Sequence, residues 1–129
     1  LPFVFVFGRS DFTVSYYGAN VFPENVSVGL EAPGVHEFLS GKFVMEVVEG
    51  SDAPPALSIV AELSPGEQRS DGREARVAAS ILNALLRLNS EFASYVPEGR
   101  RTPRVRLLPS GEPAYFPAGV KHRYTRRSQ

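Results

Sequence analysis

The sequence contains no cysteine and no tryptophan. Without cysteine, the chain has no disulfide, no thiolate metal ligand and no cysteine nucleophile. This composition is compatible with a reducing compartment, and we expect a cytoplasmic protein. No apolar run approaches the roughly 18 residues that a membrane helix needs, so we expect no membrane partner.

Compact catalytic motifs are also missing. The chain has neither a P-loop (Gly-x-x-x-x-Gly-Lys-Ser/Thr) nor a Gly-x-Ser-x-Gly nucleophile elbow. Its two histidines, His36 and His122, are far apart, and neither has a carboxylate at metal-ligand spacing. We therefore predict no metal site and no self-sufficient catalytic constellation, so the chain is not expected to be active alone.

Length and composition are those of one globular domain. The chain has 129 residues, of which 43% are hydrophobic and 22% charged, enough to bury a hydrophobic core. It begins at Leu1, and the apolar residues 1–7 lack the basic leader and cleavage site of a signal peptide. We expect a piece of a longer chain.

Charge is divided unevenly along the sequence. Residues 1–99 hold six Lys/Arg and thirteen Asp/Glu, a net charge of 6 − 13 = −7. Residues 100–129 hold eight Lys/Arg and one acid, Glu112, a net charge of 8 − 1 = +7. Such asymmetry suggests an anionic partner for the C-terminal segment. The alternative is that the basic segment complements the acidic body of the same chain.

Five segments have the pattern of β-strands. Their residues alternate between apolar and polar types or are apolar throughout, at positions 3–7, 12–17, 42–48, 57–63 and 104–108. Glycine, proline and polar residues between them predict loops, which include residues 18–20 and 109–129.

Two segments have the pattern of helices. Pro23 suits the first position of a short helix that we expect to end near residues 33–34. Asp71 with Glu74 resembles a capping box. Apolar residues then recur at spacings of three and four as far as Pro97, which predicts one amphipathic helix.

The order of these elements predicts an α+β fold. After an N-terminal β-hairpin, we expect a ferredoxin-like split βαβ arrangement, with an antiparallel sheet and both helices on one face. Many unrelated functions use this fold, so the fold alone does not identify an activity.

Residues 8–23 form the most specific sequence motif. They are Gly-Arg-Ser-Asp-Phe-Thr-Val-Ser-Tyr-Tyr-Gly-Ala-Asn-Val-Phe-Pro. This segment resembles the interdomain linker of the acyl-CoA synthetase, adenylation-domain and luciferase superfamily, in which a glycine follows the linker aspartate by seven residues, as Gly18 follows Asp11. The sequence Gly-x-Asn-Val-Phe-Pro resembles the corresponding segment of the phenylacetate–CoA ligase branch of this superfamily. The resemblance is strong over residues 3–32 and becomes one of element order and length over residues 41–108.

This resemblance implies a domain division and roles for four residues. Residues 1–11 would be the end of a large-domain strand and the linker, and residues 12–129 the small C-terminal domain. Asp11 would be the hinge, and Arg9 would contact the nucleotide. Gly18 would let the backbone approach coenzyme A, with Asn20 adding a polar contact. Taken singly, each feature also has a structural explanation, such as a tight turn with an Asx bond.

The resemblance also implies a catalytic lysine near the C-terminus. The family's lysine lies in a Gly-Lys loop and stabilises developing negative charge during adenylation. The chain has two lysines, and Lys42 opens a predicted strand, which leaves Lys121 as the candidate. Val120 separates it from Gly119, a departure from the family pattern. The alternative is that Lys121 is one more solvated charge.

Cofactors and partners follow from the same resemblance. The parent enzyme would use ATP, Mg2+ and coenzyme A, with none tightly bound to this segment. Its partners would be a large N-terminal adenylation domain of the same chain and a small carboxylic acid. Apolar residues 1–7, separated from that domain, would favour a homodimer through residues 1–17.

Two alternatives use the same fold. The basic, aromatic C-terminal segment could serve an RNA-binding module, although the acidic body and the lack of an RNP-like sequence disfavour nucleic acid. A small-ligand-sensing domain is the other alternative. Neither of them requires the sequence of residues 8–23.

Overall fold

The computed structural model describes residues 3–6, 13–48, 54–111 and 125–127 of the chain. Its strands and helices, in chain order, are β1 (Phe3–Val6), β2 (Val14–Tyr16), β3 (Ala19–Val21), α1 (Pro23–Leu30), β4 (Leu39–Val48), β5 (Ala56–Leu63), α2 (Asp71–Leu88), α3 (Ser90–Tyr95), β6 (Arg104–Leu108) and β7 (Thr125–Arg127). Two short 3-10 helices, η1 (His36–Phe38) and η2 (Glu98–Arg100), join neighbouring elements.

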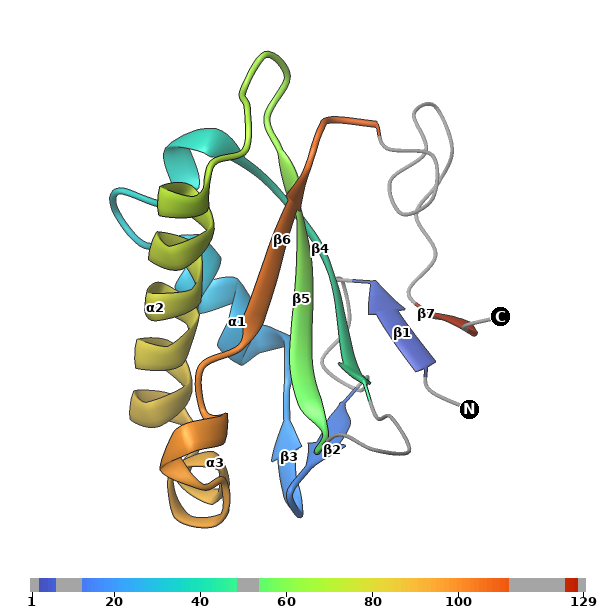
Figure 1. The fold of residues 1–129 in the computed structure, drawn as a ribbon, viewed down its shortest axis with the longest axis vertical. Coiled ribbons are helices and arrows are strands. Elements are labelled where there is room, and N and C mark those ends of the chain that lie inside the picture. The colour runs from blue at the N-terminus through green and yellow to red at the C-terminus, as the bar shows by residue number, and fades with distance from the viewer. Residues whose placement is uncertain (1–2, 7–12, 49–53, 112–124, 128–129) are drawn as a thin grey trace.

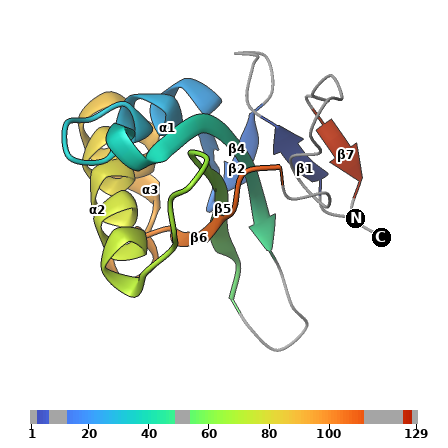
Figure 2. The same cartoon turned by 90° about the horizontal axis from the view of Figure 1, so that it is seen from above.

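The elements form two layers, a sheet and a helical layer. The sheet has the strand order β6-β5-β4-β1-β7, and β2 and β3 form a separate antiparallel hairpin. Helices α1, α2 and α3 lie on one face of the sheet, as two perpendicular views show (Figures 1 and 2). This arrangement confirms the predicted α+β class, its split βαβ order and the placement of the helices on one face.

The sheet is mixed, whereas we expected it to be antiparallel. Strands β4 and β5 are antiparallel, but β5 and β6 are parallel, with Ile59 opposite Val105. The chain between β5 and β6 passes through α2 and α3, which return it to the end of the sheet where β5 began. A crossover of this kind makes the next strand parallel to the first.

The N-terminal hairpin is present, but its strands differ from those expected. Strand β1 pairs with β4 and β7 and not with β2. Strand β2 pairs with β3 across a turn at Tyr17 and Gly18. The loop prediction was therefore wrong for Ala19 and Asn20, which belong to β3, and for residues 125–127, which form β7.

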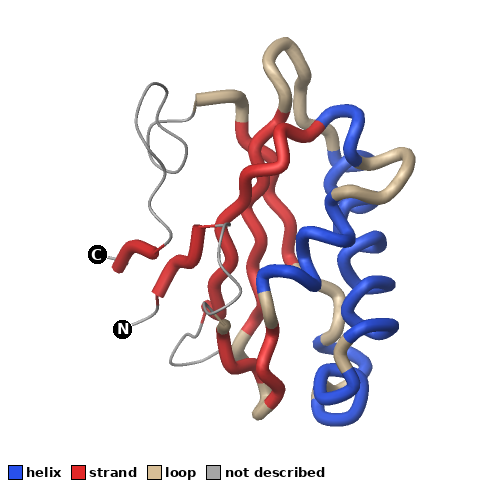
Figure 3. Tube along the Cα trace, turned by 180° about the vertical axis from the view of Figure 1, so that it is seen from behind, coloured by secondary structure: helices blue, strands red, loops and turns tan. Residues whose placement is uncertain are grey.

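The hydrophobic core lies between the sheet and the helices. Alternate residues of the central strands face the helical layer and are almost fully buried, as period-two strands require. The view from behind shows the same two layers (Figure 3). The most deeply buried side chains of this core include Phe43, Met45, Ile59, Ile81, Leu85 and Phe92.

Helices α1 and α2 pack unusually closely at Gly29. A Cβ atom at Gly29 would lie 2.7 Å from the Cα atom of Ile81, a distance shorter than Cβ atoms keep from other heavy atoms in proteins. The hydroxyl of Ser80 also donates a hydrogen bond to the Gly29 carbonyl oxygen at 2.6 Å. Glycine is therefore required here by the approach of the helices. Helix α1 ends at Leu30, a few residues before the predicted end.

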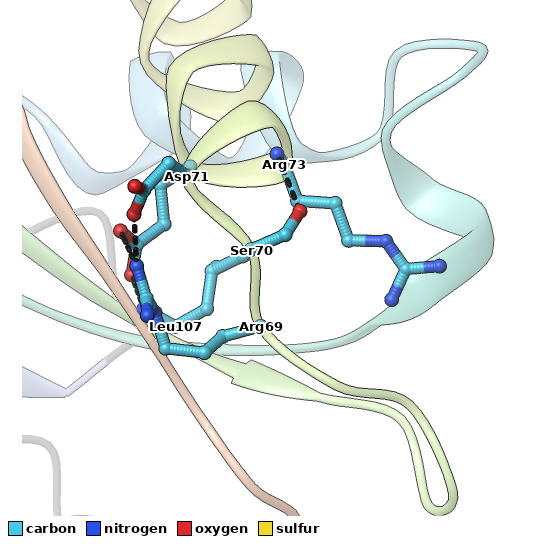
Figure 4. A network of polar contacts seen from close by, with 6 residues as sticks. Arg69, Ser70, Asp71, Arg73 and Leu107 are labelled. Carbon is cyan, nitrogen blue, oxygen red and sulfur yellow. Dashed lines mark hydrogen bonds and ion pairs between the residues drawn. The ribbon is translucent and has the colours of Figure 1, made fainter.

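The N-terminus of α2 is capped by Ser70, one residue before the predicted capping box. The Ser70 Oγ accepts a hydrogen bond from the Arg73 N–H at 3.1 Å. The Glu74 carboxylate instead binds the Arg69 guanidinium and accepts the Leu107 N–H at 3.0 Å, which connects α2 to β6 (Figure 4). The prediction of an Asp71–Glu74 capping box was therefore wrong, because Ser70 supplies the capping oxygen.

The predicted long helix is divided at Asn89. The Asn89 backbone is extended, with φ −126° and ψ 98°. This residue is both the C-cap of α2 and the N-cap of α3. The Asn89 Oδ1 accepts the Phe92 N–H at 2.9 Å, a typical N-cap contact. The stripe of apolar residues continues across this break, which is why periodicity alone predicted one helix.

Within the described residues, no helix combines the length and the apolar character that crossing a membrane requires.

Candidate functional site

The described part of the specific motif forms the β2–β3 hairpin. Val14 pairs with Val21 and Tyr16 with Ala19, which leaves Tyr17 and Gly18 as the two turn residues. Both have positive φ angles, 53° for Tyr17 and 82° for Gly18. Two consecutive positive φ values are the pattern of a two-residue hairpin turn, in which glycine is strongly favoured. The backbone conformation therefore favours glycine at position 18.

The space above Gly18 is open. A Cβ atom placed there would approach only the Tyr95 Cδ2 atom, at 4.0 Å, an ordinary van der Waals distance. The Tyr17 and Tyr95 side chains are 36% and 56% exposed. The turn therefore presents exposed backbone next to two exposed aromatic rings, and an extended ligand could lie against it.

Asn20 is fixed through its main chain. Its N–H donates to the Glu91 Oε1 at 3.0 Å, and its carbonyl accepts from the Asn89 Nδ2 at 2.8 Å. The residue is exposed, and its side chain makes no hydrogen bond to another described residue. The side-chain amide is therefore available for a ligand while the backbone beneath it is held by α3.

Asn89 organises this region, and the sequence analysis did not identify it. It is 6% exposed, and its Nδ2 also donates to the Asn25 Oδ1 at 3.0 Å. One buried amide thus joins β3, α1 and the start of α3. The signal in the sequence was the Asn-Ser pair inside an apolar stripe, since asparagine favours helix caps over helix interiors.

Tyr16 connects the other side of the hairpin to η2. Its ring is 2% exposed, and its hydroxyl donates to the Arg100 carbonyl oxygen at 2.8 Å. Burial raises the pKa of the Tyr16 phenol, and the neighbouring Tyr17 raises it further by a smaller amount. The phenol therefore stays neutral and acts as a hydrogen-bond donor that positions the hairpin.

The structure brings two of the five predicted site residues together, on one hairpin. Gly18 is in the turn, and Asn20 lies in β3 two residues later. Arg9, Asp11 and Lys121 lie outside the described residues. The geometry of Gly18 and Asn20 can therefore be compared with their expected contact with coenzyme A.

A pocket of about 460 Å³ lies at the opposite end of α1 from the hairpin. It is lined by the last turn of α1, by His36 of η1 and by residues 39–42 at the start of β4. The pairing of β4 with β5 shifts register between Leu39 and Phe43, and Gly41 has a φ of 98°. This bulge places Lys42 at the pocket, although the sequence analysis had put it aside as a strand residue.

The bulge is held by a buried carboxylate. Glu62 is 4% exposed, and its Oε1 accepts the Ser40 hydroxyl at 2.6 Å. Its Oε2 accepts the Gly111 N–H at 2.8 Å. Because both oxygens are used, Glu62 has a structural role at the start of β4.

A metal centre is not formed by the described residues. Among residues 13–48 and 54–111, no group of three or more His, Asp or Glu side chains could hold a metal ion.

Comparison with solved structures identifies a similar fold. No protein-family model matches the sequence, and no curated protein matches it significantly. A crystal structure of a domain of phenylacetate-coenzyme A ligase from Bacteroides vulgatus matches the fold, with a TM-score of 0.53 and 21% sequence identity. The match covers 81% of this chain and 86% of that chain. The chain therefore has the fold of that ligase domain over most of its length.

Proposed function

We propose that this chain is the small C-terminal domain of an ATP-dependent acyl- or aryl-CoA ligase. Such an enzyme adenylates a carboxylate and then forms a thioester with coenzyme A. The observation that carries the proposal is the β2–β3 hairpin, in which the motif glycine adopts a left-handed conformation and is open to approach. The shared fold with a phenylacetate-coenzyme A ligase domain supports it independently.

The hairpin fits the proposed contact with coenzyme A. The pantetheine arm is a narrow chain of amides and methylenes, which needs exposed backbone and a few hydrogen-bonding groups. The Gly18 turn offers exposed backbone, and the Asn20 amide offers both a donor and an acceptor. Coenzyme A would supply the thiol that becomes the thioester.

The remaining roles belong to residues outside the described part of the chain. In the proposal, Asp11 is the hinge between this domain and a large N-terminal domain, and Arg9 contacts the nucleotide. Lys121 neutralises negative charge that develops as the acid is adenylated. ATP, Mg2+ and the acid would be held mainly by the large domain, which would also choose the acid.

A homodimer through residues 1–17 was the other expected partner. The β1 backbone pairs on one edge with β4 and on the other with β7. A second copy could therefore pair with the β1 edge only after displacing β7. The proposal accordingly places the large domain of the same chain, and not a second copy, as the partner of this segment.

Acid-dependent exchange between ATP and pyrophosphate tests the proposal. The parent protein that contains this segment would be assayed with a panel of aryl and alkyl acids, alongside Lys121→Ala. As a matched control, Arg87→Ala removes an exposed cation of α2 that has no role in the proposal. We expect exchange with one class of acid, lost in Lys121→Ala and kept in Arg87→Ala.

Two results would change the proposal. Exchange that survives Lys121→Ala would keep the ligase and remove Lys121 from the chemistry. A parent protein without exchange for any acid would overturn the ligase and direct attention to ligand sensing or RNA binding. For RNA binding, a mobility shift with single-stranded RNA that weakens as salt rises is the appropriate measurement.

A further inference from the structure

The pocket at the end of α1 has a volume in the range of small-molecule sites. Its volume is about 460 Å³, within the roughly 300–1,000 Å³ typical of ligand pockets. Leu30 and Leu39, which are 3% and 8% exposed, supply an apolar wall. Polar residues complete the lining, so the pocket offers polar contacts beside the apolar wall.

Two opposite charges line the pocket from different elements. Glu31 is at the C-terminus of α1, and Lys42 is on the bulge of β4; both residues are exposed. Neither side chain forms an ion pair within the part of the chain that the structure describes. The C-terminal end of α1 adds partial negative charge of the helix dipole on the Glu31 side.

A hydroxyl group at the pocket lacks a partner. The Ser27 Oγ is buried and makes no hydrogen bond to the residues that the structure describes, an arrangement that costs free energy. Because this atom is buried, a ligand in the pocket reaches it only after the side chain turns to another staggered position. The other serine, Ser40, is already bound to Glu62, and the imidazole of His36 lies 3.3 Å from the Glu37 carboxylate.

We infer that this pocket binds a small zwitterion, an α-amino acid with an aliphatic side chain. Its carboxylate is placed toward Lys42 and its ammonium toward Glu31 and the end of α1. Its side chain packs on Leu30 and Leu39. The inference does not rest on the ligase proposal, because it uses no residue of the hairpin or of the linker.

Calorimetric titration of the 129-residue chain tests the inference with three matched probes. They are L-leucine, 4-methylpentanoate, which lacks the amino group, and 3-methylbutylamine, which lacks the carboxylate. We expect saturable binding of L-leucine that is at least about tenfold tighter than binding of either analogue, because each loses one charge-assisted contact. Equal binding of all three would overturn the zwitterion assignment.

Substitutions locate the site. Lys42→Gln and Glu31→Gln should each weaken L-leucine binding about tenfold or more. Arg87→Gln and Glu24→Gln, which remove the same charges elsewhere on α2 and α1, should leave it unchanged. Lys42→Gln and Glu31→Gln chains that keep the circular dichroism of the unsubstituted 129-residue chain but bind L-leucine normally would show that the pocket is not the site.

Ser27→Ala separates a ligand contact from a packing role. Because it removes an unpartnered hydroxyl, it should keep or raise the melting temperature of the free chain. The same variant should reduce the rise in melting temperature that L-leucine causes. No saturable binding of L-leucine by the folded parent chain would overturn the inference outright. None of these measurements involves ATP, so their failure would leave the ligase proposal standing.

Discussion

The Leu107 N–H donates a hydrogen bond to the Glu74 Oε2 at 3.0 Å, although 33 residues separate them. Leu107 belongs to β6, an outer strand of the sheet, and Glu74 lies in the first turn of α2. The carboxylate thus occupies a backbone donor that the strand would otherwise present at an unpaired edge. One side chain therefore joins the two layers and occupies one donor at an edge of the sheet.

Removing this carboxylate should destabilise the fold. Glu74→Ala leaves the Leu107 N–H without its acceptor and should lower the free energy of unfolding by about 1–3 kcal/mol. Urea denaturation followed by circular dichroism measures the loss. Asp71→Ala is the matched control, since Asp71 also binds Arg69 but its side chain is 98% exposed. Its loss should stay below about 0.5 kcal/mol, and equal losses would contradict the edge role.

The same group should make stability depend on pH in acid. The pKa of Glu74 lies below its ordinary value of 4.5. The main cause is the hydrogen bond from Arg69, and the hydrogen bond from the Leu107 N–H contributes less. A lowered pKa in the folded state means that the unfolded chain binds more protons there. The stabilisation is therefore full above the unfolded pKa and is lost as pH falls through the folded one. Urea midpoints from about pH 6 to about pH 3 should fall less steeply in Glu74→Gln than in the parent chain.

Gly29→Ala should be harmful where most glycine-to-alanine changes in helices are favourable. The added methyl group would lie 2.7 Å from the Ile81 Cα atom, and backbone cannot move aside as a flexible side chain can. We expect a loss of about 1–3 kcal/mol in the free energy of unfolding. The control is Gly72→Ala in α2, where the nearest atom is 4.0 Å away. That change should be neutral or stabilising by up to about 1 kcal/mol.

Gly18 allows its backbone role and its proposed ligand role to be separated. Gly18→Ala should cost about 1–2 kcal/mol of stability because of the positive φ angle. Gly18→Asn should cost less, since asparagine tolerates this conformation. If the turn also admits coenzyme A, Gly18→Asn in the parent enzyme should slow thioester formation while ATP–pyrophosphate exchange persists. Normal thioester formation by a folded Gly18→Asn variant would contradict the proposed contact.

Asn89→Asp tests the amide that holds the hairpin. The change keeps an oxygen to cap α3 but replaces the Nδ2 donor with a second oxygen facing the Asn20 carbonyl and the Asn25 Oδ1. We expect a loss of about 1–3 kcal/mol, measured by urea denaturation. Asn83→Asp, an exposed position in α2, should change stability by less than about 0.5 kcal/mol. Similar effects at both positions would show that Asn89 acts only as a cap.

The sequence predicted the elements whose pattern is local. Alternation identified β4, β5 and β6, and the spacing of apolar residues identified α2, because each pattern directly records which face is buried. The features that were missed leave no periodic pattern. The Ala19–Val21 strand is only three residues long and follows a two-residue turn, and Asn89 ends a helix whose apolar stripe continues.

The same distinction holds for the candidate sites. Gly18 and Asn20 were found through a resemblance, and the structure adds that the glycine is a turn residue with open space above it. The pocket at the end of α1 had no signal in the sequence, because it depends on a bulge that brings Lys42 near Glu31 and Ser27. Contacts made across 15 residues by irregular backbone leave no periodic trace.

The pairing of β1 with β7 has a kinetic consequence. Phe3 lies opposite Arg127, so 127 − 3 = 124 positions of chain must be closed before this ladder can form. Closing so long a loop is entropically expensive, whereas β4 and β5 are neighbours in sequence and pair early. The β1–β7 ladder should therefore assemble last and open first. Its amide protons should exchange with solvent faster than those of β5, without any opening of the core.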